Sequence, residues 1–130
     1  MDLKVTFWGV RGSKPTPGKN TILFGGNTSC VQIEAGNRNL IFDSGTGIVS
    51  LGQEMMKQVG RKKADIFFSH LHWDHIQGLP FFEPIYKAGN SFCLYGEDKE
   101  NRNFRQIIEL QMSYPYFPVT MEKMEADIEF

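Results

Sequence analysis

All three histidines of this 130-residue chain lie within six positions, as His70, His72 and His75, and an aspartate, Asp74, stands among them. Imidazole nitrogens and carboxylate oxygens are ligands that zinc and other transition metals take in proteins. The cluster directly follows residues 64–69, an apolar segment whose composition predicts a short buried β-strand. The sequence therefore favours a fold that carries a metal site at the end of a strand.

Local geometry predicts that the four side chains act as two pairs. In an extended backbone, residues i and i+2 point to the same side, so His70 and His72 can hold one metal ion. If the chain turns into a helix after Trp73, Asp74 and His75 form a second pair nearby. Two adjacent ions can share a bridging water and lower its pKa towards neutrality, which produces a hydroxide nucleophile. Asp74 is then the expected catalytic residue, as a metal ligand that also hydrogen-bonds this water.

A closed structural zinc site is the alternative for the same cluster. Six adjacent residues cannot easily wrap four ligands around one ion, so Cys30 or Cys93 would have to join them. Both cysteines stand in apolar stretches, which favours two reduced, buried thiols in a cytoplasmic protein. The sequence has neither a signal-peptide pattern nor an apolar run of the ~18 residues that span a bilayer, so no membrane partner is expected.

The balance of acidic and basic residues indicates which binding partners are expected. Fourteen basic and fifteen acidic residues give a formal charge of -1, which argues against a polybasic arm and makes extended nucleic acid an unexpected partner. Asn27 and Ser29 are candidates for donating hydrogen bonds to an anionic substrate, and Arg11 for binding a phosphate, although Asn27 and Ser29 could equally close a turn after two glycines. A solvated side chain is the alternative for Arg11.

Asp43 is a further candidate because it follows a predicted strand and precedes the turn residues 44–47, SGTG. Its carboxylate could orient a ligand histidine or the loop that carries one. The alternative is an aspartate that caps a helix or stabilises a turn. The sequence leaves both interpretations open.

The rest of the chain predicts an α/β fold of the α+β type, a single domain of residues 1–130 with a mixed sheet and helices on one face. Helical spacing predicts helices near residues 46–60, capped by Thr46, and near residues 97–112, with Asp98 at its start. Residues 9–27 form a long glycine-rich connection, which in a small domain is more often functional than idle. Strands are predicted at residues 3–8, 28–35, 39–43, 64–69, 91–95 and 126–130.

Three stretches carry a resemblance to a known family. Residues 70–75, HLHWDH, resemble the H-x-H-x-D-H motif of the metallo-β-lactamase superfamily of metal-dependent hydrolases, and residues 40–47 resemble its earlier Asp-x-Gly motif. Residues 8–18 and 25–30 are similar to those of the branch with ribonuclease Z-like and phosphodiesterase-like members. The resemblance implies the first half of a four-layer αββα sandwich, in which two β-rich halves pack face to face between helices.

The resemblance also implies two divalent metal ions as cofactors. In this family His70 and His72 correspond to ligands of the first ion, and Asp74 and His75 to ligands of the second. Zinc is expected first, with manganese or iron as alternatives, because imidazole and carboxylate ligands accept all three. Flavodiiron oxidoreductases of the superfamily have glutamate in place of His72, so a histidine there implies a hydrolase.

Members of this superfamily take further ligands from a C-terminal half, and no histidine follows His75. The resemblance therefore implies a truncated chain with half of the ligands and an exposed sheet face and edge, completed by a missing C-terminal half or by self-association. The expected function is hydrolysis of phosphodiester bonds by a hydroxide that bridges two metal ions, with a small phosphodiester or another ester as the expected substrate. The alternatives are a catalytically silent metal-binding or oligomerising fragment, and a hydrolase of thioester or lactam substrates.

Overall fold

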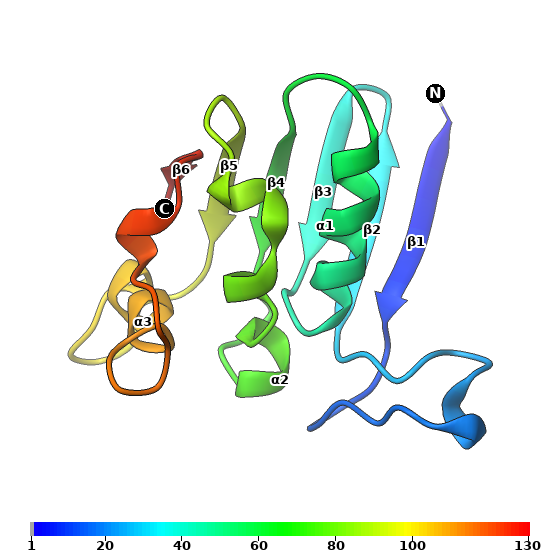
Figure 1. Cartoon of the computed structure of the whole chain (residues 1–130), viewed down its shortest axis with the longest axis horizontal. Helices are drawn as coiled ribbons and strands as arrows, with labels where there is room; N and C mark the ends of the chain where they lie inside the picture. Colours follow the sequence, from blue (N-terminus) through cyan, green and yellow to red (C-terminus); the bar gives the residue numbers. More distant parts are fainter. Residues whose placement is uncertain (1) are drawn as a thin grey trace.

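A six-stranded mixed β-sheet, covered by helices on one face, forms the framework of the molecule (Figure 1). The computed structural model describes residues 2–130. The strands follow one another across the sheet in chain order, which confirms the expected mixed sheet. They are β1 (Leu3–Gly9), β2 (Cys30–Ala35), β3 (Arg38–Phe42), β4 (Lys63–Phe67), β5 (Ser91–Tyr95) and β6 (Asp127–Glu129).

The sheet is antiparallel on one side and parallel on the other. β1, β2 and β3 pair antiparallel, and β3 to β6 pair parallel. The turn at Gly36, whose φ is 61°, joins β2 and β3, and glycine adopts this left-handed conformation without steric cost. Because parallel strands end at the same edge, the segments that follow β3, β4 and β5 meet there.

The helices share one face of the sheet. They are α1 (Gly47–Lys57), α2 (Trp73–Ile76) and α3 (Phe104–Leu110), with short 3₁₀ segments η1 (Lys19–Thr21), η2 (Leu79–Phe81), η3 (Glu83–Tyr86) and η4 (Met121–Lys123). Alternate strand residues point to the helical face, so apolar side chains from both layers meet in one core. Its fully buried members include Ile41, Ile66, Phe92, Leu94, Ile48, Leu51 and Phe82.

The predicted helix at residues 97–112 is wrong in its first half, because only Phe104–Leu110 is helical. Asp98 does act at the helix start, but from the preceding loop, where its Oδ1 accepts the Phe104 N–H at 2.7 Å. Asn103 adds a capping box with Gln106. These competing side-chain bonds hold the preceding residues out of the helix.

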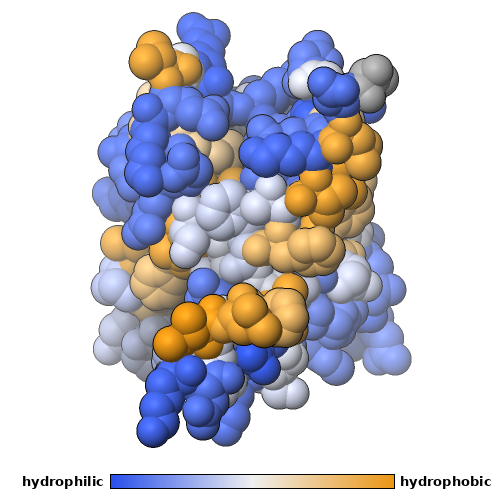
Figure 2. Space-filling model, turned by 90° about the vertical axis from the view of Figure 1, so that its right-hand side faces the viewer, coloured by the Kyte–Doolittle hydropathy of each residue, from blue (hydrophilic) through white to orange (hydrophobic). Residues whose placement is uncertain are grey.

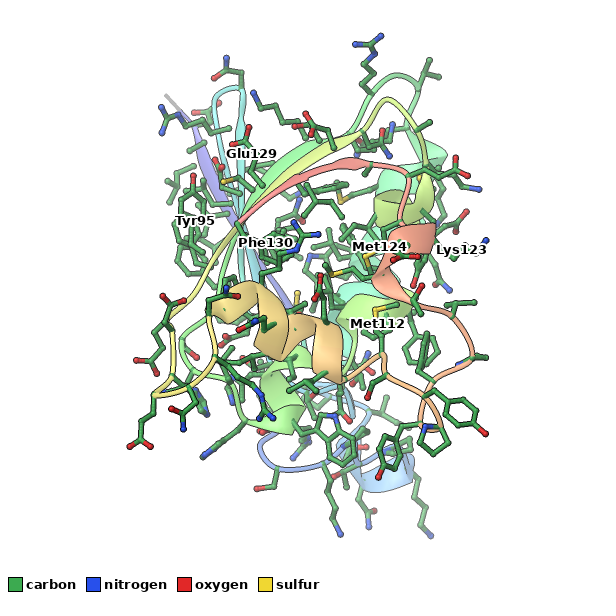
Figure 3. The ribbon with its side chains drawn as sticks, turned by 90° about the vertical axis from the view of Figure 1, so that its left-hand side faces the viewer. Tyr95, Met112, Lys123, Met124, Glu129 and Phe130 are labelled. Carbon is green, nitrogen blue, oxygen red and sulfur yellow. The ribbon has the colours of Figure 1, made fainter. Side chains whose placement is uncertain are left out.

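The other face of the sheet is bare. Phe42, Phe67 and Tyr95 stand in register on β3, β4 and β5, and their rings stack with centroids 5.3 and 4.6 Å apart. Phe7 continues the apolar surface on β1, with 68 % of its area exposed. Figure 3 shows Tyr95 on the side of the sheet opposite to Met112 and Met124 of the helical layer. The expected exposed sheet face is therefore present.

The two cysteines are free and differ in burial. Cys30 is fully buried in the core, and this burial raises the pKa of its thiol far above the ordinary value. Cys93 is only half-buried, which corrects the expectation of two buried thiols. Within residues 2–130, no helix has both the length and the apolar character needed to cross a membrane.

Candidate metal centre

The histidine cluster lies at the edge of the sheet where β4 ends. The chain leaves β4, bends at Ser69 and is extended at His72, whose φ and ψ are -62° and 149°, before it turns into α2. The imidazole rings gather here, with ring centroids of His70 and His72 4.6 Å apart and those of His70 and His75 4.0 Å apart. The turn after the extended segment is the local geometry that the sequence predicts.

Two carboxylates contact opposite nitrogens of the His75 ring. Asp43 Oδ2 lies 2.9 Å from Nδ1, and Asp74 Oδ2 lies 3.3 Å from Nε2. All three side chains are largely buried, with exposures of 8 % for Asp43, 12 % for Asp74 and 18 % for His75. A carboxylate on Nδ1 holds the ring in one orientation and leaves Nε2 available as a ligand.

Ser69 connects the same carboxylate to a second histidine. Its N–H donates to Asp43 Oδ1 at 2.8 Å, and its hydroxyl lies 2.8 Å from Asp43 Oδ2. The hydroxyl is also 3.0 Å from His70 Nδ1. Asp43 therefore contacts His75 directly and His70 through Ser69. Its proposed role in orienting ligands stays a prediction.

The backbone of Asp43 is in the left-handed region, with φ at 63°. Aspartate tolerates this conformation better than most residues because its short polar side chain can bond locally. The conformation follows β3 directly and turns the chain towards α1, so Asp43 also makes a turn. Both interpretations of Asp43 left open by the sequence thus have a geometric basis.

Asp74 is held in its charged form. Partial desolvation is the largest influence and raises the pKa of its carboxyl. The backbone N–H of Ser13, which donates to Oδ2 at 2.8 Å, acts in the opposite direction, as do the neighbouring His75 and His70. Together the lowering influences prevail, and the pKa of Asp74 lies below its ordinary value. A deprotonated carboxylate is the form that binds a metal ion.

The candidate substrate-binding residues are engaged in holding the loop. The Asn27 side-chain oxygen accepts a hydrogen bond from the Thr46 hydroxyl at 3.1 Å, and the Arg11 Nε donates to the Gly25 carbonyl at 2.9 Å. The hydroxyl of Ser29 points to Asp43 Oδ2 at 3.4 Å. Asn27 is therefore bonded to the start of α1 rather than within the turn that follows the two glycines, and Arg11 is not simply solvated.

Thr46 does not cap α1 with its side chain, contrary to prediction. Its hydroxyl instead accepts the Thr28 N–H at 2.9 Å, and its own N–H donates to Thr28 Oγ1 at 2.8 Å. This reciprocal pair fastens the start of α1 to the segment before β2.

The loop of residues 10–27 carries Arg11, Lys14 and Lys19 and no acidic residue. Its tip exposes Ile22, Leu23 and Phe24, each more than 70 % accessible. Figure 2, seen from the β1 side, shows hydrophobic side chains low on the molecule, where this loop lies, above a hydrophilic rim. The loop thus has a cationic and partly apolar surface.

Gly45 allows the backbone after β3 to pack closely against Asp74 and Thr28. An alanine Cβ there would lie 2.4 Å from both the Asp74 carbonyl oxygen and Thr28 Oγ1. We expect Gly45→Ala to lower the free energy of unfolding by about 1–3 kcal/mol, as measured by urea denaturation, because backbone must move.

Gly12→Ala is the matched control for this prediction. A Cβ on Gly12 meets no atom within 4 Å, so its free energy of unfolding should fall by no more than about 0.5 kcal/mol. Equal effects of the two substitutions would contradict the packing argument for Gly45.

One pair of donors has the spacing that a single divalent metal ion requires. Two ligands about 2.0 Å from a tetrahedral zinc ion lie about 3.3 Å apart, and His75 Nε2 and Asp74 Oδ2 are separated by 3.3 Å. The Nδ1 atoms of His70 and His75 are already engaged by oxygen atoms, as is usual for ligand histidines. Among residues 2–130, no three His, Cys, Asp or Glu side chains are placed to hold one ion together.

Sequence reasoning missed Ser69 and Ser13. Ser69 immediately precedes the motif, so its position beside the ligands could have singled it out. Ser13 is 61 residues away from Asp74 along the chain, and no local pattern indicates that contact.

A mixed sheet with helices on one face and a histidine–aspartate cluster at a strand end are the features of a metallo-hydrolase-like domain. Residues 23–114 match the sequence profile of the metallo-beta-lactamase superfamily. The chain belongs to this superfamily, which confirms the resemblance inferred from its motifs.

Among its relatives are ribonuclease Z proteins. The chain is 28 % identical to ribonuclease Z of Haloarcula marismortui over 97 % of its own length and 39 % of the relative, and 30 % identical to that of Natronomonas pharaonis over 92 % and 37 %. The fold is similar to that of a diphosphatase from the PhnP family, with a TM-score of 0.61, 18 % identity, and 98 % of this chain aligned to 49 % of the other. The chain spans about two fifths of the length of these curated relatives.

Proposed function

We propose that this chain supplies the first ligand pairs of a metal-dependent hydrolase of phosphodiester bonds. The observation that carries the proposal is the Asp43–His75–Asp74 arrangement, in which one carboxylate orients the imidazole and the other stands beside its free nitrogen. Membership of the metallo-beta-lactamase superfamily and similarity to ribonuclease Z support it.

His70 and His72 would hold one ion, and Asp74 and His75 a second, with zinc as the first expectation. When bound, the ions would lower the pKa of water and neutralise the charge that develops on the phosphodiester. Asp43 keeps His75 oriented through Nδ1, and Ser69 does the same for His70. Asp74, ionised at neutral pH, would accept a hydrogen bond from the attacking water.

The remaining ligands would come from outside these two pairs. The bare sheet face with Phe42, Phe67 and Tyr95 is the surface on which we propose that a second β-rich half packs, and in its absence a second copy. Either would bury exposed aromatic area and bring further donors to the same edge.

Both RNA and small molecules contain phosphodiester bonds, so the kind of substrate is a separate question from the kind of bond. The relatives named ribonuclease Z cleave RNA by name, which runs against the expectation that extended nucleic acid is not a partner. Lys14 and Lys19 of the loop beside the centre would attract a phosphodiester of either size. We therefore propose RNA and small phosphodiesters as the two substrates to compare.

The test is hydrolysis of bis(p-nitrophenyl) phosphate and of a short RNA, before and after chelation and after readdition of zinc or manganese. We expect turnover that chelation removes and metal restores. Turnover unaffected by complete metal removal would contradict the proposal.

A catalytically silent metal-binding fragment is the second candidate. It is favoured by one observation, that no three donors in residues 2–130 gather around one point. Binding of fewer than two ions per chain in a zinc titration, together with no hydrolysis of either substrate, would support it. Activity restored by a chain that carries the missing ligands would support the hydrolase.

A further inference from the structure

Ser13 is one of two non-glycine residues with positive φ in the part of the chain that the structure describes, and the other is Asp43. The φ of Ser13 is 67°, and its backbone N–H donates to Asp74 Oδ2 at 2.8 Å. Left-handed backbone in a non-glycine residue is unfavourable and persists where the surrounding structure enforces it, often at functional sites. Both such residues contact the same ligand pair.

The loop enforces this conformation because its two branches are joined at several points. The N–H of Arg11 donates to the Asn27 carbonyl at 2.9 Å, and the N–H of Thr16 donates to the Gly26 carbonyl at 2.8 Å. The Arg11 side chain adds its bond to the Gly25 carbonyl. Ser13 lies between these bonds, so the position of its amide is set from both sides by the loop.

The amide is the group that matters, because the Ser13 residue is exposed while its N–H meets a largely buried carboxylate. A backbone donor to a carboxylate makes a charge-assisted bond, which favours the ionised form and restricts rotation of the carboxylate. The Ser13 amide therefore restrains the Asp74 carboxylate, just as the Asp43 carboxylate restrains the His75 ring, although Ser13 lies in a different part of the chain.

We propose that Ser13 is a positioning residue, whose backbone amide, held in left-handed conformation by the loop of residues 10–27, fixes the Asp74 carboxylate for metal binding. The metal-binding part of this inference rests on the proposed function. The positioning itself does not, because the contact joins two groups of the chain itself.

The contact is tested first in the metal-free chain by amide hydrogen exchange measured with NMR. In Asp74→Ala the Ser13 amide should exchange at least about tenfold faster than in the unsubstituted chain, because its acceptor is gone. The Thr16 amide, which bonds Gly26, is the internal control and should keep its rate. An unchanged rate at Ser13 would overturn the proposal, whatever the chain catalyses.

The consequence for metal binding is tested by titration with Co²⁺, followed by its visible absorption and by calorimetry. Ser13→Pro removes the N–H and cannot adopt positive φ, whereas Ser13→Gly retains the N–H and adopts it freely. We expect the affinity to fall about 10- to 100-fold in Ser13→Pro and to stay within about threefold in Ser13→Gly.

Wild-type affinity in a folded Ser13→Pro variant would overturn the proposal. If that variant does not fold, the hydrogen-exchange result decides. If the unsubstituted chain binds no Co²⁺, the proposed function fails, and the exchange result still decides whether Ser13 positions Asp74.

Discussion

Replacing Asp74 by alanine is expected to abolish the proposed metal-dependent hydrolysis without unfolding the sheet. The substitution removes one proposed ligand and the only carboxylate of the HLHWDH motif, which has a lowered pKa and lies 3.3 Å from His75 Nε2. A loss of about 4 kcal/mol of transition-state stabilisation lowers kcat about a thousandfold. The measurements are kcat for the small phosphodiester, the metal content after dialysis, and the urea midpoint.

Asp2→Ala is the matched control, because it removes the same side chain from an exposed position next to β1. Its kcat and metal content should equal those of the unsubstituted protein. If Asp74→Ala kept more than a tenth of the turnover with full metal content, the role of Asp74 as ligand and hydrogen-bond acceptor would be rejected.

Replacing Asp43 by alanine is expected to reduce both stability and metal affinity. The substitution removes the buried Asp43 carboxylate that accepts the Ser69 N–H, places alanine in left-handed backbone, and frees the His75 ring. A hydrogen bond to a charged group contributes about 1.5–3 kcal/mol, and left-handed alanine costs about 1–2 kcal/mol. We expect a loss of about 3 kcal/mol in urea denaturation and a 10- to 100-fold weaker affinity for Co²⁺.

Asp43→Asn separates the two roles of this residue. Asparagine tolerates the left-handed backbone and keeps one oxygen acceptor, so most of the stability should return. Its NH2 group, which only donates, replaces one carboxylate oxygen, so it cannot accept both from the Ser69 N–H at the Oδ1 position and from His75 Nδ1 at the Oδ2 position. The metal affinity should therefore stay reduced. Full recovery of affinity in Asp43→Asn would mean that the residue only makes the turn.

Local patterns explain why much of the site could be predicted. His70 and His72 are two residues apart just before a short helix that contains Asp74 and His75, so their grouping follows from spacings within six residues. The strands could also be predicted, because apolar alternation and the turn at Gly36 are local features of the sequence. The segment before α3 was mispredicted because the Asp98 and Asn103 side chains compete with helical bonding there.

Contacts between distant segments could not be predicted in this way. Ser13 and Asp74 meet because the loop of residues 10–27 closes on itself beside the end of β4. Thr46 bonds Thr28 instead of capping its own helix because the fold brings the segment before β2 to the start of α1. No periodicity or motif in the sequence indicates that Ser13 contacts Asp74 or that Thr46 contacts Thr28.

The sequence by itself determined the residue types of the proposed ligands, their grouping over six positions and the strand that precedes them, since these depend on side-chain chemistry and on spacings of a few residues. Only the tertiary structure decided which groups contact them: it brings Asp43, a candidate from the sequence, to His75, and it adds Ser69 at His70 and Ser13 at Asp74. These contacts arise where chain segments are brought together by packing of the whole sheet against its helices, and that packing is a property of the entire chain rather than of any one segment.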